Sequence, residues 1–564
     1  MLNRPYQNAA LKESYNKYAL GVTRQLIVLP TGTGKTVVFA NLPNHHGLRG
    51  RIMVLVHTEE LVNQAVDKIR KWNPSYNVDI EKAEQWTSTN ANVIVASVAT
   101  LGREGSERLK RFKPEEFDAI ICDEAHHSTA DSYIRIFNHF GLLADNNKKL
   151  LVGVTATPNR GDGVGLNLVY DEIVYQMSIL DAIKQGWLSD LRGIRITTDT
   201  SLDSVKTRAG DFETGDLGRT VNTPARNRLI VEGWQKYAQD RQTVVFCVDV
   251  QHAKDLADEF MRAGIPSQAV WGDDPSREEK LKAHKAKTLR VLCNCNVLTE
   301  GYDDWQLACI VTARPTKSPL MFAQQIGRGT RIPEGIDNLV EARKKGVPLA
   351  KTDCIVLDVA DVTMKHSLVS LPGLLGMNPK LDLKGKSAVA ALEEIKAAQQ
   401  QHPNADFNQL TDITKLKTFA QEIDLFRVTY SPEVVKHSSN GWVPTLDNEG
   451  YVLYMHGGET LVITKDLLNK YHIIGTVRGA QVHLIADDLE SAFANADAMV
   501  RQLGGKFYAN LTNRDAAWRD DVPSRAQLNL CKRLKINVPP GASKGDVTAR
   551  LNRFFAQQPN RRRA

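Results

Sequence analysis

The segment Pro30-Thr31-Gly32-Thr33-Gly34-Lys35-Thr36 lies between an apolar run, Leu26 to Leu29, and the helix-forming sequence Val37-Val38-Phe39-Ala40. A glycine-rich turn between a buried strand and a helix is the context of a P-loop, in which backbone N–H groups at the helix N-terminus hold phosphate oxygens. The strict pattern has glycine five residues before Gly34, where this chain has Leu29. We predict that the segment binds nucleotide phosphates and that the fold is α/β.

The residues of this loop have separate expected roles. In a P-loop the lysine reaches the β- and γ-phosphates and the hydroxyl after it ligates Mg²⁺, so we assign these roles to Lys35 and Thr36. The rest of the predicted phosphate cradle consists of Thr31, Gly32, Thr33 and Gly34.

Short apolar runs alternate with helix-like stretches through the first two thirds of the chain. Continuous rather than alternating apolarity is what a parallel sheet covered on both faces requires. A first series, within residues 1–193, consists of Leu26 to Leu29, Ile52 to Val56, Val93 to Ala96, Ala119 to Cys122 and Leu150 to Val154. A second series, within residues 194–375, consists of Val244 to Val248, Ala269 to Val270, Val291 to Cys295, Cys309 to Thr312 and Cys354 to Val359. Two successive α/β domains are therefore predicted.

The sequence pattern changes after residue 375. Residues 376–425 are predicted to form a helical linker, with an Ala/Gln/Glu-rich helix near 387–401. Residues 426–510 carry alternating and aromatic segments punctuated by glycine, which predict a small antiparallel sheet followed by a helix. Residues 511–564 are predicted to form a short helical module that holds 12 lysine and arginine residues against four aspartates. This basic segment is a candidate for binding a phosphate backbone, or a solvated tail without a partner.

Composition excludes several classes of protein. The hydrophobic fraction of 42% and the charged fraction of 24% are ordinary for a water-soluble protein, and no apolar run approaches the roughly 20 residues of a membrane span. The first residues are polar, so we expect a cytoplasmic or equivalent soluble compartment and no membrane partner. The seven cysteines lie mostly in apolar runs, which favours reduced, packed thiols over disulfides or a metal site.

Asp123-Glu124-Ala125-His126 follows the apolar run that ends at Cys122. Side chains at the carboxyl end of such a strand emerge beside the P-loop. Asp123 can bind Mg²⁺ and Glu124 can polarise the attacking water. His126 is placed to relay changes between the nucleotide and the track, by which we mean the surface that would bind a polymer substrate.

A second phosphate-directed segment, Gln324-Gln325-Ile326-Gly327-Arg328-Gly329-Thr330-Arg331, lies far along the chain. Arg328 and Arg331 are three residues apart and would share a helix face. Hydrolysis of a γ-phosphate gains most from added positive charge. Gly327 and Gly329 are poor residues inside a helix unless another segment approaches closely. We expect these arginines to complete the nucleotide site from the second domain.

Together these segments resemble superfamily 2 helicases of the DEAD/DEAH type. The P-loop, Asp-Glu-Ala-His, Thr155-Ala156-Thr157-Pro158 and Gln324-x-x-Gly327-Arg328-x-x-Arg331 occur in the order of motifs I, II, III and VI. Arg4-Pro5-Tyr6-Gln7 is similar to the adenine-reading element, and Thr299-Glu300-Gly301-Tyr302-Asp303 is similar to motif V. His57-Thr58-Glu59-Glu60-Leu61 resembles the RadD, XPB-like and restriction-motor (ResIII-type) branch. The resemblance covers residues 1–375 and implies two tandem RecA-like domains with parallel sheets.

The resemblance also implies roles for individual residues. It implies ATP contacts at Arg4, Gln7, Gly301 and Asp303, and a catalytic role for Gln324 beside Lys35, Asp123, Glu124, His126, Arg328 and Arg331. Thr155 and Thr157 would couple the nucleotide site to the track. The nucleic-acid contacts would be His57, Thr100, Arg103 and Thr299, mostly to the backbone, which position a strand without reading bases.

The end of the chain resembles a SAP-like helical module, through Pro523-Ser524-Arg525-Ala526-Gln527-Leu528 and Gly541-Ala542-Ser543-Lys544-Gly545-Asp546. This resemblance implies DNA contacts at Lys532, Arg533, Lys535 and Lys544, with Arg550, Arg553 and Arg561 to Arg563 adding charge. Trp442 and Tyr451 in the β-rich segment could form a stacking surface, although core packing is the more common role of such residues.

These observations lead to one functional expectation and three alternatives. We expect an ATP hydrolase that uses ATP and Mg²⁺, a monomeric DNA helicase or translocase of replication, recombination or repair. Its expected partners are single-stranded, forked or branched DNA and proteins of those processes. The alternatives are the duplex-tracking motor of a restriction-type system, an ATP-gated nucleic-acid clamp and an RNA helicase.

Overall fold

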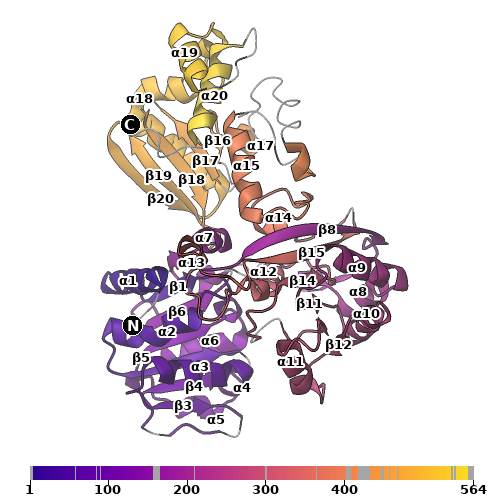
Figure 1. Ribbon diagram of the computed structural model, residues 1–564. Coiled ribbons are helices and arrows are strands. Elements are labelled where there is room, and N and C mark those ends of the chain that lie inside the picture. Colours follow the sequence, from indigo (N-terminus) through magenta and orange to yellow (C-terminus); the bar gives the residue numbers. More distant parts are fainter. Residues whose placement is uncertain are drawn as a thin grey trace. The chain divides into compact units, whose positions relative to one another are not determined.

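The computed structural model describes residues 4–57, 59–83, 85–88, 90–156, 165–208, 210–298, 302–363, 365–401, 407, 410–416, 432–445, 450–455, 458–466, 468–534, 536, 538 and 542–556. The chain divides into two compact units, residues 1–371 and 372–564 (Figure 1). The first unit holds two parallel sheets and the second holds one antiparallel sheet. The predicted fold class is therefore confirmed.

The first sheet has seven strands in the order β3-β4-β2-β5-β6-β1-β7, and the recorded pairings are parallel. Its central strands are buried along nearly their whole length, as continuous apolar runs require. The strands are β1 (Arg24–Val28), β2 (Arg51–Val56), β3 (Val78–Glu81), β4 (Val93–Ser97), β5 (Phe117–Asp123), β6 (Leu150–Thr155) and β7 (Glu172–Gln176).

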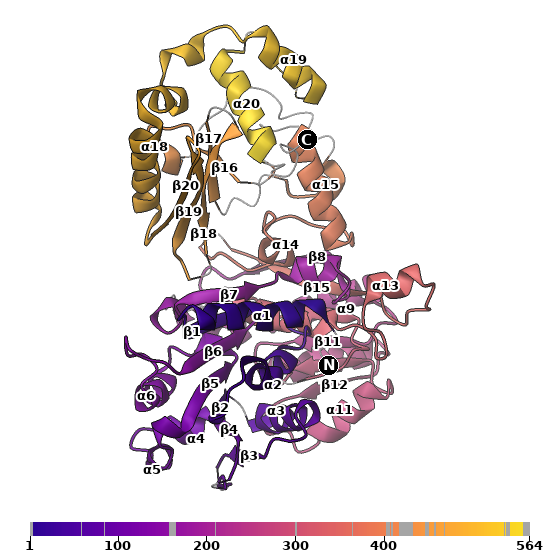
Figure 2. The ribbon, with the colours of Figure 1, turned by 90° about the vertical axis from the view of Figure 1, so that its left-hand side faces the viewer.

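Helices cover both faces of this sheet. Three of them, α1 (Pro5–Ala19), α2 (Lys35–His46) and α3 (Glu59–Trp72), lie on one face, and α6 (Asp131–Phe140) lies on the other (Figure 2). The shorter helices of this domain are α4 (Val98–Leu101), α5 (Glu107–Lys110) and α7 (Ile179–Lys184).

The second sheet has six parallel strands in the order β12-β13-β11-β14-β15-β8. They are β8 (Asp190–Ser201), β11 (Thr243–Phe246), β12 (Ser267–Val270), β13 (Val291–Asn294), β14 (Cys309–Thr312) and β15 (Asp353–Val362). A small pair, β9 (Thr207–Arg208) and β10 (Asp211–Phe212), follows β8. The expected domain boundary at 193/194 falls inside β8, which belongs to the second sheet. The helices are α8 (Thr214–Val221), α9 (Pro224–Tyr237), α10 (Val250–Arg262), α11 (Arg277–Lys285), α12 (Pro319–Gly327) and α13 (Leu339–Lys344), and α14 (Leu371–Leu374) follows β15.

The parallel arrangement brings functional segments to one edge of the first sheet. Neighbouring strands β2, β5, β6 and β1 run in the same direction, so their carboxyl ends share an edge. The P-loop follows β1, Asp123 ends β5, Thr155 ends β6 and His57 follows β2. Four stretches that are distant in the sequence thus meet because of strand order alone.

The second unit contains five antiparallel strands in the order β16-β17-β18-β19-β20. Helix α18 packs on the sheet through apolar residues that include Phe493 and Val500. Trp442 is fully buried against Phe493, so it belongs to the core rather than to a stacking surface. The elements are α15 (Ala388–Gln401), α17 (Pro432–His437), β16 (Val443–Pro444), β17 (Gly450–Tyr454), β18 (Thr460–Lys465), β19 (Tyr471–Val477), β20 (Ala480–Ala486), α18 (Leu489–Thr512), α19 (Arg525–Leu534) and α20 (Lys544–Ala556).

All seven cysteines are buried as free thiols. Burial raises the pKa of Cys122 to about 12, which keeps this thiol protonated and unreactive at neutral pH. Among the helices of the described ranges, none has the length and apolarity needed to cross a bilayer.

A buried ion pair ties together the elements of the second sheet. The Arg226 guanidinium on α9 donates two hydrogen bonds of 2.8 Å to the Asp361 carboxylate on β15. It also donates to the Ala313 carbonyl, and the Thr198 hydroxyl of β8 donates to the same carboxylate. Both charged side chains are almost fully inaccessible to solvent. Loss of either partner would leave an uncompensated charge inside the domain.

The substitution Asp361→Ala should lower the free energy of unfolding by about 3–5 kcal/mol, because it leaves the Arg226 charge buried. Urea denaturation followed by circular dichroism would measure the loss. The matched control is Arg262→Ala, which removes an ion pair whose arginine is 68% exposed and should cost at most about 1 kcal/mol. Equal small shifts in both variants would show that the buried pair does not stabilise the domain.

Candidate nucleotide site

The P-loop has the backbone geometry that its glycines predict. Gly32 and Gly34 adopt positive φ angles of 88° and 80°, a conformation that L side chains rarely adopt. A side chain at Gly34 would also collide with the Gln7 amide, since its Cβ would lie 2.8 Å from Nε2. Helix α2 begins at Lys35, so the N-terminal N–H groups of that helix follow the turn directly.

The N-terminal segment supports the P-loop through its backbone. The Tyr6 hydroxyl and the Gln7 amide both donate to the Thr33 carbonyl, and Arg4 donates to the Tyr6 hydroxyl at 3.1 Å. The Tyr6 ring packs edge-on against Trp187, with centroids 5.4 Å apart. The sequence predicted Arg4 and Gln7 as nucleotide contacts, but it did not predict the supporting roles of Tyr6 and Trp187.

Lys35 is paired with Glu124 of the same domain. Its ammonium donates to Glu124 Oε1 at 2.8 Å, and both side chains are nearly buried, with 11% and 12% exposure. Burial acts to raise the pKa of Glu124, but the Lys35 charge and the neighbouring His126 outweigh burial and hold that pKa below its ordinary value. Glu124 is therefore ionised at neutral pH.

Asp123 lies beside this pair and its environment suits a cation. Burial and the adjacent Glu124 charge raise the pKa of Asp123, although Lys35 opposes the shift. A carboxylate whose ionised form is disfavoured gains from a bound cation. Thr36 lines the same cavity, and carboxylate and hydroxyl oxygens are ligands that Mg²⁺ accepts. The residues present therefore fit the ion that the sequence predicts.

His126 links the carboxylates to the end of β6. Its Nδ1 lies 3.2 Å from the Thr155 hydroxyl and 3.4 Å from Glu124 Oε2, and its side chain is buried. The next residue, His127, stacks on His57 with ring centroids 4.0 Å apart and planes inclined by 15°. Contacts thus run from the P-loop partner Glu124 to the exposed His57.

The glycine-rich segment of the second domain packs directly on the P-loop. A Cβ at Gly327 would lie 2.7 Å from Thr31 Cβ, closer than side-chain atoms pack. A Cβ at Gly329 would lie 2.3 Å from the buried Cys354 sulfur. Helix α12 ends at Gly327 and continues as a 3-10 turn, η4 (Arg328–Thr330). The expected close approach of another segment is therefore present on both sides of this turn.

The two predicted arginines are both in this region but have different partners. Arg331 forms an ion pair with Asp303, and its side chain is only 17% exposed. Burial lowers the pKa of Arg331 to about 10, so the guanidinium stays charged at neutral pH. Arg328 is buried and donates to the Tyr302 carbonyl at 3.1 Å.

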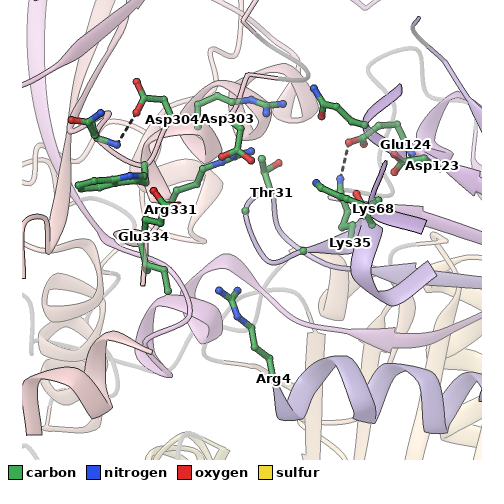
Figure 3. A pocket seen from close by; sticks show the side chains of 18 of the residues that line it. Arg4, Thr31, Lys35, Lys68, Asp123, Glu124, Asp303, Asp304, Arg331 and Glu334 are labelled. Carbon is green, nitrogen blue, oxygen red and sulfur yellow. Dashed lines mark hydrogen bonds and ion pairs between the residues drawn. The ribbon is translucent and has the colours of Figure 1, made fainter. Parts of the chain in front are cut away.

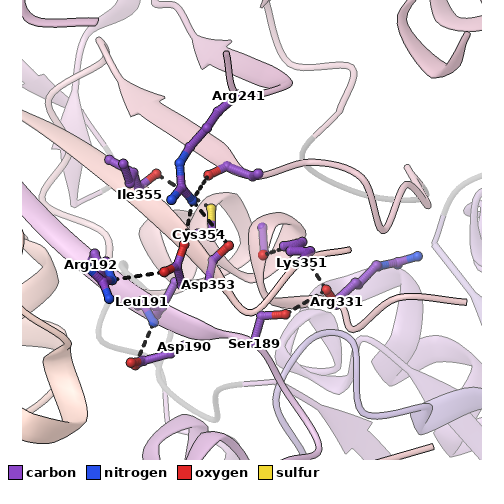
Figure 4. Close-up of polar contacts among 12 residues, drawn as sticks. Ser189, Asp190, Leu191, Arg192, Arg241, Arg331, Lys351, Asp353, Cys354 and Ile355 are labelled. Carbon is purple, nitrogen blue, oxygen red and sulfur yellow. Dashed lines mark hydrogen bonds and ion pairs between the residues drawn. The ribbon is translucent and has the colours of Figure 1, made fainter. Parts of the chain in front are cut away.

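A buried lysine fixes the backbone at Arg331 (Figure 4). The Lys351 ammonium donates to the Gly329 carbonyl at 2.6 Å and to the Arg331 carbonyl at 3.0 Å. The Ser189 hydroxyl donates to the same Arg331 carbonyl at 3.0 Å. Burial lowers the pKa of Lys351 to about 8. Sequence inspection gave no reason to select Lys351, because its partners are main-chain atoms.

A cavity of about 640 Å³ joins these groups (Figure 3). Its walls come from both domains, with Lys35, Glu124 and Asp123 on one side and Arg331 and Asp303 on the other. Other predicted residues on the wall are Arg4, Thr31, Gly32, Gly34, Thr36 and Arg328. Gln324 is buried in α12 and is not part of the lining.

Several lining residues were not predicted from the sequence. They are Gln64, Lys68, Lys285, Asp304, Trp305, Gln306, Ile332 and Glu334. Gln64 and Lys68 are four residues apart on α3, a spacing that places both on one helix face. This spacing, on the helix that follows His57, was the signal from which the sequence could have predicted these two lining residues. Burial lowers the pKa of Lys68, and the Arg331 charge adds to the shift.

The predicted nucleic-acid contacts that the structure describes are not among the residues that line this cavity. Thr100, in the short helix α4 that follows β4, accepts a hydrogen bond from the Ala83 N–H, and Arg103 is exposed. Lys532 and Arg533 are exposed on the last turn of α19, and Lys544 contacts Asp521 at 3.5 Å. Arg550 is 2% exposed, so its suggested contribution to a DNA surface is wrong. Thr157, Thr299, Gly301 and Lys535 lie outside the described residues.

Family models match three parts of the chain. Residues 1–160 match the "Type III restriction enzyme, res subunit", residues 225–333 match the "Helicase conserved C-terminal domain", and residues 422–563 match the "Mitochondrial helicase Irc3, C-terminal domain". The last match spans the antiparallel sheet together with α19 and α20. The SAP-like resemblance of the final helices stays a prediction.

Two fungal relatives and one solved structure give the extent of similarity. The protein irc3 of Schizosaccharomyces pombe, named as a mitochondrial ATP-dependent helicase, is 30% identical over 563 residues, which cover 95% of this chain and 87% of the relative. IRC3 of Saccharomyces cerevisiae, named as an ATP-dependent helicase, is 33% identical over 412 residues, 70% of this chain and 56% of that relative. A fragment of an HsdR subunit of a type I restriction enzyme from Vibrio vulnificus is 20% identical with a TM-score of 0.47, and the alignment covers 68% of this chain and 70% of the fragment.

The match to irc3 extends over nearly the whole chain, and the two motor domains match helicase families in the predicted order. The protein is thus an ATP-hydrolysing helicase that binds nucleic acid. The chain belongs to the Irc3 family of ATP-dependent helicases, within the restriction-motor branch of superfamily 2.

Proposed function

We propose that this protein is a DNA helicase or translocase that uses ATP hydrolysis between its two RecA-like domains to move along or remodel DNA. The observation that carries the proposal is the contact between the P-loop of the first domain and the glycine-rich turn of the second domain. Gly327 of the second domain lies against Thr31 of the P-loop, and the Lys35 and Arg331 side chains line one cavity. A nucleotide in this cavity would touch both domains, so its hydrolysis would change how they are held together.

Lys35 and Arg331 are each paired with a carboxylate of their own domain. Lys35 binds Glu124, and Arg331 binds Asp303. Phosphate oxygens are stronger attractors of these cations, since they carry more charge than one carboxylate. Nucleotide binding would therefore exchange both partners and leave Glu124 ionised beside the γ-phosphate. In that state Glu124 can orient the attacking water and accept a proton from it.

The remaining residues have supporting roles in the proposal. Asp123 and Thr36 would hold Mg²⁺, which supplies positive charge against the phosphate oxygens. Arg331 would stabilise the charge that develops in the transition state, with Arg328 bracing the turn through the Tyr302 carbonyl. Lys351 and Ser189 would keep the Arg331 backbone in position.

Contacts through the histidines would carry the nucleotide state to the track. His126 touches both Glu124 and Thr155, and His127 stacks on His57. Displacement of Glu124 on nucleotide binding would alter this chain of contacts and change the surface around His57. We infer DNA as the polymer from the basic surplus of the last segment and from the restriction-type match of the first domain. A soluble compartment with access to DNA, cytoplasmic or mitochondrial, suits this activity.

The substitution Lys35→Ala should abolish ATP hydrolysis, because it removes the cation expected on the β- and γ-phosphates. Nucleic-acid-stimulated phosphate release would measure the loss. Lys12→Ala, which removes an exposed lysine from α1, is the matched control and should leave turnover unchanged. Near-normal stimulated turnover in the Lys35 variant would refute the proposed site.

The substitution Arg331→Ala should preserve most nucleotide binding and lower turnover by about 10³-fold or more. The reason is that this arginine is expected to act on the transition state, whereas its resting partner is Asp303. Binding of a fluorescent ATP analogue and single-turnover hydrolysis would separate the two effects. An equal loss of binding and turnover would mean that Arg331 belongs to the ground-state binding site.

Polymer preference distinguishes a DNA helicase from the other candidates. ATPase stimulation should be strongest with DNA when single strand, duplex, fork, four-way junction and RNA are compared at one salt concentration. Strand-displacement and triplex-displacement assays should accompany the ATPase measurement. Triplex displacement alone would indicate a duplex-tracking motor of the restriction type, and neither activity would indicate an ATP-gated clamp. Stimulation by RNA alone would contradict the DNA assignment.

A further inference from the structure

An exposed tryptophan follows the edge strand of the first sheet. Trp86 is 56% exposed, which is unusual for so large an apolar side chain. It follows a tight turn closed by two backbone hydrogen bonds between Lys82 and Gln85, of 3.1 and 2.7 Å. On its other side, the Thr87 N–H donates to the buried Glu81 carboxylate at 2.9 Å. The backbone before and after Trp86 is therefore fixed while its indole faces solvent.

Two arginines lie over this indole. The Arg108 and Arg111 guanidinium carbons are 3.8 and 4.5 Å from the Trp86 ring centroid. The Glu81 carboxylate, which is fully buried, holds both guanidinium groups at 3.4 and 3.9 Å. The four side chains form a cluster with two positive charges and one buried negative charge. Its solvent side is aromatic and cationic, since the Arg111 side chain is 40% exposed.

The position of this cluster connects it with the predicted track. Strands β3, β4 and β2 are neighbours and run parallel, so the residues after Glu81 share an edge with those after β4 and β2. Thr100 follows β4 and His57 follows β2. The Ala83 N–H, within the turn that precedes Trp86, donates to the Thr100 hydroxyl at 3.1 Å. The cluster thus adjoins Thr100, a predicted contact to a nucleic-acid phosphate. It follows β3, the edge strand farther from the P-loop strand β1.

A comparison within the chain separates this cluster from ordinary cation–π packing. Trp271 also follows an edge strand, β12, and has Lys254 and Lys280 over its ring at 4.5 and 4.7 Å. However, Trp271 is partly buried against the core of its own domain. Trp86 is 56% exposed, and a stabilising role does not require that exposure.

We propose that Trp86, Arg108 and Arg111 form a binding site for an unpaired segment of the DNA strand, at the outer end of the track on the first domain. The exposed indole would stack on a base or pack against its sugar, and the arginines would contact the adjoining phosphate. A base inside a duplex is already stacked on its neighbours, so the site selects single-stranded DNA. This inference rests on the proposed function and specifies which polymer the first domain grips.

Equilibrium binding to a fluorescein-labelled 20-nucleotide thymidine strand tests the proposal, measured by anisotropy beside a blunt 20-base-pair duplex. Trp86→Ala should weaken single-strand binding about tenfold, the loss of roughly one stacked base, and weaken duplex binding less than about twofold. Trp86→Phe should retain binding within about threefold, because a second aromatic ring can still stack. Arg111→Ala should lower the salt dependence of single-strand binding by about 0.7 in the logarithmic slope.

The matched control is Tyr237→Ala. Tyr237 is 41% exposed and has Lys236 over its ring. However, it ends α9 and precedes β11, so it lies toward the amino ends of the strands in its sheet rather than the carboxyl ends. This variant should bind both probes as the wild type does. Unstimulated ATP hydrolysis should also stay unchanged in the Trp86 variants, because Trp86 does not line the nucleotide cavity.

Three results would overturn the inference. They are wild-type single-strand affinity in Trp86→Ala, equal losses on the single strand and the duplex, and a loss in Trp86→Phe as large as in Trp86→Ala. Failure of the proposed function would look different, because the wild-type protein itself would then bind neither DNA probe or show no stimulation of ATP hydrolysis by DNA.

Discussion

The contact between Gly327 and Thr31 is the constraint on which the motor depends. Only a residue without a side chain lets the second domain approach the P-loop this closely, since a Cβ would lie 2.7 Å from Thr31 Cβ. On the other side of the same turn, Gly329 fits against Cys354, and Lys351 binds the backbone carbonyls of Gly329 and Arg331. The backbone that carries Arg331 is therefore fixed by packing and by a buried ammonium, not by the flexible arginine side chain itself.

Two of the ion pairs at the site each lie within a single domain. Lys35 is paired with Glu124, and Arg331 is paired with Asp303. In the proposed function, Glu124 would become available to water when Lys35 moves to a phosphate. Nucleotide binding and activation of the proposed base would then be the same event.

The first sheet separates two kinds of chemistry along one edge. Strands β1, β5 and β6 end at the phosphate loop, the carboxylates and Thr155, whereas β2, β4 and β3 end at His57, Thr100 and the Trp86 cluster. The histidines His126, His127 and His57 connect the two halves through direct contacts. The second unit has its own core around Trp442 and Phe493 and presents basic residues on α19. Its family match is to the Irc3 C-terminal domain, so it distinguishes this chain from motors that share only the first unit's domains.

The sequence by itself determined the two parallel sheets, the antiparallel sheet and most of the nucleotide site. Continuous apolar runs require burial on both faces, and the backbone needs of a phosphate loop restrict Gly32, Gly34 and Lys35 to a recognisable local pattern. It did not determine the roles of Lys351, Lys68 or Trp86. Lys351 binds main-chain carbonyls, and Lys68 lines a cavity shared with another domain. Trp86 contacts arginines that lie 22 and 25 residues later in the chain. It also suggested Arg550 as a DNA contact, although tertiary packing buries that side chain. Local patterns report which backbone a segment can adopt, whereas burial and charge pairing depend on which segments the completed fold brings together.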